Sequence, residues 1–292
     1  MDAEGLSRAV RRQLGLGRLL PLGDAADGAW LAESAAAEAL YGAVSRDLPD
    51  VRMGGLRLCL ADPDTAAPPA VPPPPSALPP GPLHIDAEFA TAPHAPLTTT
   101  AELVRAVLLT AADRALGLRV ATVDLRITDL LESGDGHDGH GSFDGPGEDT
   151  APAAGAGAPG AAGTEPGVRG LRRTGDGRRP PAPADEPRGA ATAQAVISVP
   201  GVTRLAPALG SGLGGLPAEA VTVTDTADAD GRGAGRHLRI QLAVAEGSRV
   251  LDVARAVRHA AEKAAAWDAE EPTAPVTVAV LVSAIDPAPR NG

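Results

Sequence analysis

The stretch Leu83-His84-Ile85-Asp86-Ala87-Glu88-Phe89 alternates apolar and polar residues. Because successive side chains of a β-strand point to opposite faces of the sheet, this alternation predicts a strand with one face in a core and the other toward water. Residues 99–117 follow with apolar side chains at helical spacing, and residues 120–131 alternate again. The segment 83–131 therefore predicts a strand, a helix and a second strand.

The ends of this predicted helix carry sequence signals. Thr99 and Glu102 have the spacing of a capping box, in which two side chains bond to backbone N–H groups of the first turn. Gly117 is suited to the left-handed conformation that closes many helices. We therefore expect the helix to begin at Thr99 and to end near Gly117.

Two further elements precede this unit. Apolar residues of the segment 30–44, with Trp30 and Tyr41 among them, recur at helical spacing, so we expect a helix with Asp27 as its N-cap. Residues 56–60 alternate and predict a short strand. The segment 61–82 is rich in proline, and this composition favours an extended, semi-rigid spacer between the strands.

The C-terminal half shows the same order of elements, namely helix, strand, strand, helix, strand. Four stretches match between the halves, at offsets of 151, 155, 150 and 155 residues. Unrelated amphipathic segments also resemble one another, but agreement in both order and offset favours duplication. We therefore predict an α+β fold of two tandem α-β-β-α-β repeats with small sheets. The matched stretches are 48–51 with 199–202, 83–89 with 238–244, 103–107 with 253–257, and 123–127 with 278–282.

Glycine and proline mark the joints between these units. The 292 residues include 35 Gly and 29 Pro, and the segment 132–188 holds 14 of the glycines and eight of the prolines without apolar periodicity. We predict that this segment is a long disordered Gly/Pro/Asp-rich linker. The expected organisation is a basic N-terminal arm (1–28), a divergent first repeat with a proline-rich insert (29–131, insert 61–82), the linker (132–188), a second repeat (189–286) and a tail (287–292).

Composition excludes several classes of protein. The formal net charge of -11 argues against a uniformly basic nucleic-acid binder. The single cysteine, Cys59, excludes an intramolecular disulfide and a multi-cysteine zinc site, and fits a reducing compartment. No run approaches the roughly 20 apolar residues of a membrane span, so we expect a cytoplasmic protein without a transmembrane segment. Abundant Ala, Gly, Pro and Arg with one lysine is typical of a GC-rich bacterium.

The second half has a distinctive series of motifs. Its helix ends in a Val-Pro-Gly-Val turn, a glycine-rich loop follows, a strand leads into Gly247, and the next helix has the spacing Val-Ala-Arg-x-Val. In these motifs it resembles the alkaline-shock or envelope-stress-response family of bacteria. The first half is similar but has Asp50 in place of the motif glycine and carries the proline-rich insert. The family-motif residues, which concern fold and not chemistry, are Val199, Pro200, Gly201, Val202, Gly247, Val253, Arg255 and Val257.

This resemblance implies a non-enzymatic protein of the envelope or alkaline stress response that acts as a scaffold. The expected partner is the protein itself, a related family member or a membrane-anchored protein, with a location in the cytoplasm or at the inner membrane face. The resemblance implies no cofactor and no catalytic residue. It predicts that association, and not chemistry, is the activity of this chain.

Two short motifs suggest other functions. His137 and His140 lie among aspartates in the predicted linker and have a metal-binding spacing, but nothing there pre-organises ligands. Residues Gly212 to Gly215 imitate the backbone clamp of nucleic-acid-binding KH domains. With the linker arginines they define an alternative function as a nucleic-acid-binding module, although no basic residue lies in that loop. These arginines are Arg169, Arg172, Arg173, Arg178 and Arg179.

Remaining candidates have simpler interpretations. Leu6, Val10 and Leu14 with neighbouring arginines predict a short basic amphipathic helix, either touching an anionic membrane or docked on the first repeat. Cys59 lies within a predicted strand and has no evident histidine partner for nucleophilic catalysis. The three histidines on predicted polar faces are expected to be solvent-exposed, with a pH-sensing role as the alternative. They are His84, His237 and His259.

Overall fold

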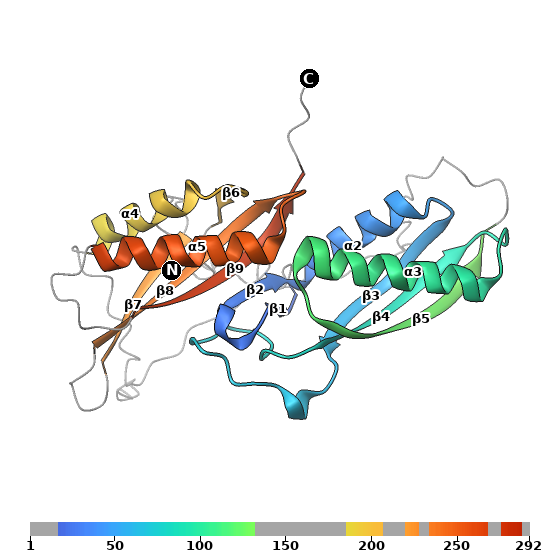
Figure 1. Ribbon diagram of the computed structural model, residues 1–292, viewed down its shortest axis with the longest axis horizontal. Coiled ribbons are helices and arrows are strands. Elements are labelled where there is room, and N and C mark those ends of the chain that lie inside the picture. The colour runs from blue at the N-terminus through green and yellow to red at the C-terminus, as the bar shows by residue number, and fades with distance from the viewer. Residues whose placement is uncertain (1–16, 132–184, 207–219, 228–233, 268–275, 288–292) are drawn as a thin grey trace, which may run out of the picture. The chain divides into compact units, whose positions relative to one another are not determined.

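The protein is an α+β chain with two mixed β-sheets, each covered on one face by helices (Figure 1). The computed structural model describes residues 17–131, 185–206, 220–227, 234–267 and 276–287. The linker predicted over 132–188 lies outside these residues except at its end, because helix α4 (Asp185–Ile197) begins four residues before the expected boundary at 189.

The first sheet has the strand order β3-β4-β5, with β3 antiparallel and β5 parallel to the central strand. Helix α3 connects the two parallel strands, and α2 packs beside it (Figure 1). A π-helical turn, η3 (Ala112–Leu116), continues α3 and closes on Gly117 at φ 81°. The elements are α2 (Glu33–Asp47), β3 (Val51–Leu60), β4 (Leu83–Thr91), α3 (Leu97–Ala111) and β5 (Val120–Leu130).

The strand predicted at 83–89 is confirmed as β4. Leu83, Ile85, Ala87 and Phe89 are fully buried, while Asp86 on the opposite face is exposed. Burial of one face accounts for the alternation, because the helices cover that side of the sheet alone.

The second sheet has the strand order β1-β2-β9-β8-β6, with β7 also paired to β8. Strands β8 and β9 are parallel and joined through α5, and α5 packs on β9 and α4. The second helix expected in the C-terminal half is confirmed as α5, and its apolar side chains Val257 and Ala261 are at 0% exposure. The elements are β6 (Val202–Leu205), β7 (Val221–Ala227), β8 (Ala234–Ala245), α5 (Val250–Trp267) and β9 (Val276–Asp286).

An N-terminal hairpin completes this second sheet. Strands β1 (Leu19–Leu22) and β2 (Ala29–Ala32) flank the short 3₁₀-helix η1 (Ala25–Asp27), and β2 runs parallel to β9. The boundary expected between residues 28 and 29 therefore falls inside a hairpin that belongs to the sheet of the C-terminal half.

The helix expected over 30–44 begins later than predicted. Trp30 lies in β2 and is 1% exposed, and α2 starts at Glu33. The expectation was wrong because β2 is buried on both faces, so Trp30 shows no alternation and fits the helical spacing of the residues that follow. Asp27 is likewise not the N-cap of α2, since that position is held by Ala32.

The proline-rich insert is not a free spacer. Leu78 N–H donates to the Leu19 carbonyl at 2.8 Å, and Leu19 N–H donates to the Ser76 carbonyl at 3.2 Å. The Trp30 indole Nε1 donates to the Leu78 carbonyl at 3.2 Å, and Val71 is 4% exposed. The insert, which includes the short helix η2 (Pro63–Thr65), therefore docks against the hairpin.

Two local predictions are also corrected. The capping box at Thr99 and Glu102 does not form, because α3 begins at Leu97 with Pro96 as N-cap and no side-chain cap. His237, expected to be exposed, is 6% exposed. It lies on β8, a strand that buries residues on both faces, so alternation alone does not tell which face meets water.

Candidate functional site

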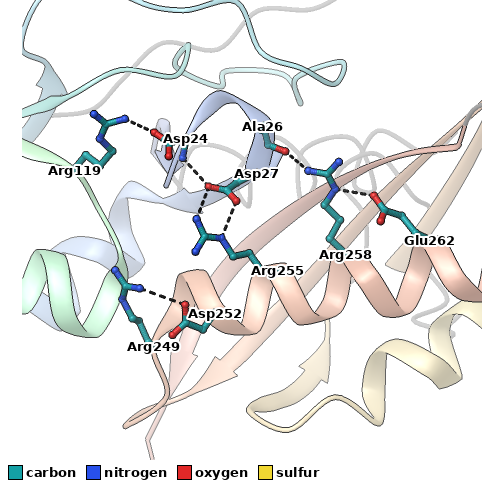
Figure 2. A network of polar contacts seen from close by, with 9 residues as sticks. All are labelled: Asp24, Ala26, Asp27, Arg119, Arg249, Asp252, Arg255, Arg258 and Glu262. Atoms are coloured by element: carbon teal, nitrogen blue, oxygen red, sulfur yellow. Dashed lines mark hydrogen bonds and ion pairs between the residues drawn. The ribbon is translucent and has the colours of Figure 1, made fainter.

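A network of ion pairs joins η1 to helix α5 (Figure 2). The Arg255 guanidinium donates to both carboxylate oxygens of Asp27, with distances of 2.7 Å from Nε to Oδ1 and 3.0 Å from Nη2 to Oδ2. The Asp27 side chain is 13% exposed and that of Arg255 is 48% exposed. This two-pronged geometry fixes orientation as well as distance, so it holds the hairpin on the helix in one position.

The Asp27 carboxylate is held in its ionised form. Burial alone would raise its pKa, but the hydrogen bond from Arg255, the backbone N–H of Asp24 and the charges of Arg255 and Arg258 outweigh burial and lower the pKa of Asp27. The Asp24 N–H donates to Asp27 Oδ2 at 2.7 Å. The hydrogen bond to Asp27 in turn raises the pKa of Arg255. The pair therefore stays charged over the neutral range.

Three more arginines extend the network on either side of this pair. Arg258 donates to the Ala26 carbonyl and to Glu262, the latter at 2.8 Å from Nε to Oε1. Arg119, which follows η3, pairs with Asp24. Arg249 at the start of α5 donates from Nε to the Asp113 carbonyl at 3.1 Å and pairs with Asp252. The network thus ties α5 to both η1 and η3.

A second polar cluster lies where the hairpin meets the first sheet. Glu33, at the start of α2, accepts hydrogen bonds from the Arg18 side chain and from the Leu58 N–H, the latter at 3.3 Å. Arg18 Nη2 also donates to the Leu58 carbonyl at 2.7 Å. Burial opposes ionisation of Glu33, but these hydrogen bonds and the charge of Arg18 outweigh it and lower the pKa of Glu33.

The face of the first sheet opposite its helices carries charged side chains in rows. His84 on β4 lies 2.7 Å from Thr122 Oγ1 through Nδ1 and 3.6 Å from Asp124 through Nε2. Further along the same strands, Glu88 and Arg126 form an ion pair at 3.8 Å. These groups contact one another across the β4-β5 pair and offer a polar binding surface.

His237 occupies a related but buried position in the second sheet. Its Nδ1 lies 2.9 Å from Thr277 Oγ1 on β9, while its Nε2 is buried without a hydrogen-bond partner. Burial, with the nearby charge of Arg239, lowers the pKa of His237. The neutral imidazole is therefore the favoured form in the folded chain.

The family-motif residues of the second half are structural in this fold. The Val199-to-Val202 turn links α4 to β6, with the Val202 N–H donating to the Val199 carbonyl at 3.1 Å. Gly201 has φ 92° and sits 2.7 Å, measured from an ideal Cβ, from a Val253 methyl, so no side chain fits there. Pro200 is exposed. The others lie further along, with Gly247 at φ 90° before α5, and with Val253, Val257 and Arg255 on that helix.

Several predicted residues lie outside the part of the chain that the structure describes. These are His137, His140, the Gly212-to-Gly215 loop, the linker arginines and the arm at Leu6 to Leu14. Within the described residues, no group of three or more His, Cys, Asp or Glu side chains gathers around a common point. No described helix is both long enough and apolar enough to cross a bilayer.

Little of the ion-pair network is visible in the sequence. Arg255 is a motif residue, but its partner Asp27 is 228 positions away and is expected as a helix cap. Asp24 and Arg119 have no local signal, and Arg258 has one only in its i,i+4 spacing to Glu262. The only available hint was the placement of opposite charges on segments that the topology brings together.

The described residues define an α+β protein whose polar clusters bind its own elements to one another. Comparison of the chain with protein-family models, with curated proteins and with solved structures found no match.

Proposed function

We propose that the two halves are divergent copies of one α-β-β-α-β unit. The equivalent hydrogen bonds support this. The Val51 N–H donates to Leu48 and the Val202 N–H to Val199. His84 pairs in register with Thr122, as His237 does with Thr277. This register matches β4 to β8 at an offset of 153 residues, 237 minus 84, two fewer than the match read from the sequence.

The interruptions in the strands support the same proposal. Strand β3 is continuous but bulges between Met53 and Leu56, where Gly54 and Gly55 lie. In the C-terminal half two strands share the corresponding pairing with β8. Strand β6 pairs with β8 up to Leu205, and β7 continues the pairing from Val221. The break thus falls at the same point in both units, as expected if a loop was gained or lost at one bulge.

We further propose that the protein is a non-enzymatic, self-associating or partner-binding scaffold. The proposal rests on the positions of the large apolar side chains that are exposed to solvent. Four of the five exposed large hydrophobic side chains among the described residues lie on α3 and β5. Leu97, Leu103 and Leu109 are six residues apart and so lie on different sides of α3, where each is available to a partner. The four are Leu97 (39% exposed), Leu103 (49%), Leu109 (36%) and Leu130 (50%).

The placement in the envelope or alkaline stress response rests on the resemblance of the second half to the alkaline-shock family. In this proposal the scaffold works in the cytoplasm or at the inner membrane face, held there by a membrane-anchored partner. The residues that support it are those of the Val199-to-Val202 turn, Gly247 and the Val253-to-Val257 spacing.

Light scattering of the full chain after size exclusion, with and without surface variants, tests association. The double variant Leu103→Ser/Leu109→Ser should reduce self-association or partner capture. Ile197→Ser on α4 removes an equally exposed side chain, at 42%, and should not. Equal behaviour of both variants would contradict the assignment of α3 as the surface.

Cell fractionation tests the stress role separately. Under alkaline or envelope stress we expect the protein to increase in amount or to move to the membrane fraction together with a defined partner. An unchanged amount and location under both stresses would contradict the stress role while leaving the association result intact.

A further inference from the structure

The edges of the described strands are not equally protected. The outer edge of β9 is occupied by β2, which pairs with it in parallel. The outer edge of β1 is bridged by the proline-rich insert at Ala77. Unpaired strand edges invite further strands, so proteins cover or block them. The second sheet does so with the chain's own N-terminal segments.

Side chains block the edge of β3. Leu58 of this strand binds Glu33 through its N–H and Arg18 through its carbonyl. The Tyr41 hydroxyl donates to the Gly54 carbonyl at 2.7 Å, beside the bulge. A bulge together with three backbone groups bound by side chains hinders a further strand from pairing there more than the single bound carbonyl of β5 does.

Strand β5 is left as the long open edge of the first sheet. It has 11 residues and corresponds in topology to β9, but no described strand lies on its outer side. Arg105 of α3 donates to the Val123 carbonyl at 3.3 Å, and the register with β4 shifts at residues 121 and 128. A further strand would therefore pair over residues 122–127 and would displace Arg105 from the Val123 carbonyl. Asp124 and Arg126 extend into solvent, with side chains 79% and 76% exposed. The position that β2 fills beside β9 is therefore open beside β5 among the described residues.

The sequence of β5 is complementary to itself. If two copies pair antiparallel about Leu125, Asp124 of each lies opposite Arg126 of the other. On the helix-covered face the β-branched residues Val123 and Ile127 face each other. Opposite charges and β-branched residues in directly facing positions are the pairs that stabilise antiparallel strands.

The charges within one copy favour such a partner. In the β4-β5 register Asp86 lies directly opposite Asp124, a like-charge pair that destabilises a sheet. Arg57 flanks Asp86 on the β3 side. The outer side of Asp124 has no cation on a neighbouring described strand, and Arg126 of a second copy would supply one.

We propose that a second copy of this chain docks on the β5 edge, so that two three-stranded sheets join into one six-stranded sheet across a twofold axis. This inference rests on the proposed self-association and adds to the α3 surface a strand contact, with its register, on the neighbouring β5. A closed twofold contact uses the same strand from both copies, so it ends at a dimer. A strand-edge contact is small, and interfaces below about 1,200 Å² are typically weak and transient.

Charge reversal tests the register. Arg126→Asp places two like-charged pairs across the axis and should weaken dimerisation about tenfold, as Asp124→Arg should. The double variant Asp124→Arg/Arg126→Asp restores opposite charges and should return the dissociation constant to within about threefold of the wild type. Arg46→Asp, a reversal at an arginine that is 64% exposed on α2, is the matched control and should have no effect.

Sedimentation of these full-length variants over a concentration series separates this inference from the proposed function. Loss with the single variants and recovery with the double variant supports the β5 contact. Self-association that all variants retain overturns the β5 contact but leaves a self-associating scaffold standing. A chain that is monomeric at its highest soluble concentration overturns both the β5 contact and self-association.

Disulfide cross-linking between engineered cysteines tests the same register independently. In a Cys59→Ser background, Asp124→Cys and Arg126→Cys are made as separate proteins. Because positions 124 and 126 face each other across the axis, a disulfide should form when the two proteins are mixed, and much less in either alone. Equal cross-linking in the mixture and in each protein alone would overturn the register.

Discussion

Asp27 and Arg255 are 228 residues apart in the sequence and form the closest two-pronged ion pair of the network between η1 and α5, at 2.7 Å and 3.0 Å. The aspartate belongs to the N-terminal hairpin, and the arginine to the helix that connects the two parallel strands β8 and β9. This one pair therefore links the N-terminal hairpin to the helix at the centre of the C-terminal half.

Removing this ion pair should destabilise the fold more than removing an exposed one. Asp27→Asn, Arg255→Gln and the double variant form a double-mutant cycle, with an expected coupling of about 1–2 kcal/mol in urea unfolding because Asp27 is largely buried. The exposed pair Arg46–Glu246 gives a matched cycle, with an expected coupling below about 1 kcal/mol. Equal couplings would show that the Asp27 pair has no special role.

Stability should fall in acid partly through Asp27 and Glu33. Both have a lowered pKa in the folded chain, so their contribution is complete above the pKa of the unfolded chain, near 4, and is lost as pH falls through the lower folded value. Urea midpoints measured from pH 7 to pH 3 should decrease below about pH 5. In Asp27→Asn and Glu33→Gln that decrease should be smaller, although both variants start from lower stability.

His237 should produce a separate pH dependence nearer neutrality. Its pKa is lowered in the folded chain, so the unfolded chain binds the proton more readily and stability falls as pH drops below about 6.5. The slope for one proton cannot exceed about 1.4 kcal/mol per pH unit. His237→Asn should flatten stability between pH 7 and 5. A slope unchanged in this variant would assign the effect to other groups.

Trp30 should be essential to the hairpin's place in the second sheet. It is 1% exposed, and its indole N–H donates to Leu78 of the proline-rich insert. Trp30→Ala should cost about 3–5 kcal/mol in chemical denaturation, because it leaves a large cavity where the hairpin and the insert meet. Trp30→Phe keeps most of the ring volume and should cost clearly less. Similar losses in both variants would indicate that the hydrogen bond, and not packing, is decisive.

Two glycines have the same left-handed backbone conformation but differ in the space that an added Cβ would find. Gly201 has φ 92° and an added Cβ would lie 2.7 Å from Val253, whereas Gly247 has φ 90° and open space around it. Gly247→Ala should cost about 1–2 kcal/mol from backbone strain alone. Gly201→Ala should cost more, because the clash adds to the same strain. Thermal unfolding of the two variants measures the difference.

The helices and strands with one buried face were predictable because their period is visible in the sequence. Strand β4, helix α5 and the left-handed Gly117 after α3 all follow from local pattern. The start of α2 did not, because Trp30 lies in a strand buried on both faces and leaves no alternation to detect. The position of His237 was missed for the same reason.

The sequence by itself determined the α+β class, the order of most elements and the apolar stripes that build each core, since these depend on side chains a few residues apart. Tertiary structure alone decided that residues 19–32 join the sheet of the C-terminal half, that the proline-rich insert docks on Trp30, and that Asp27 meets Arg255. Those contacts join segments that are far apart in the chain. A local sequence pattern does not show which distant segment will lie beside it.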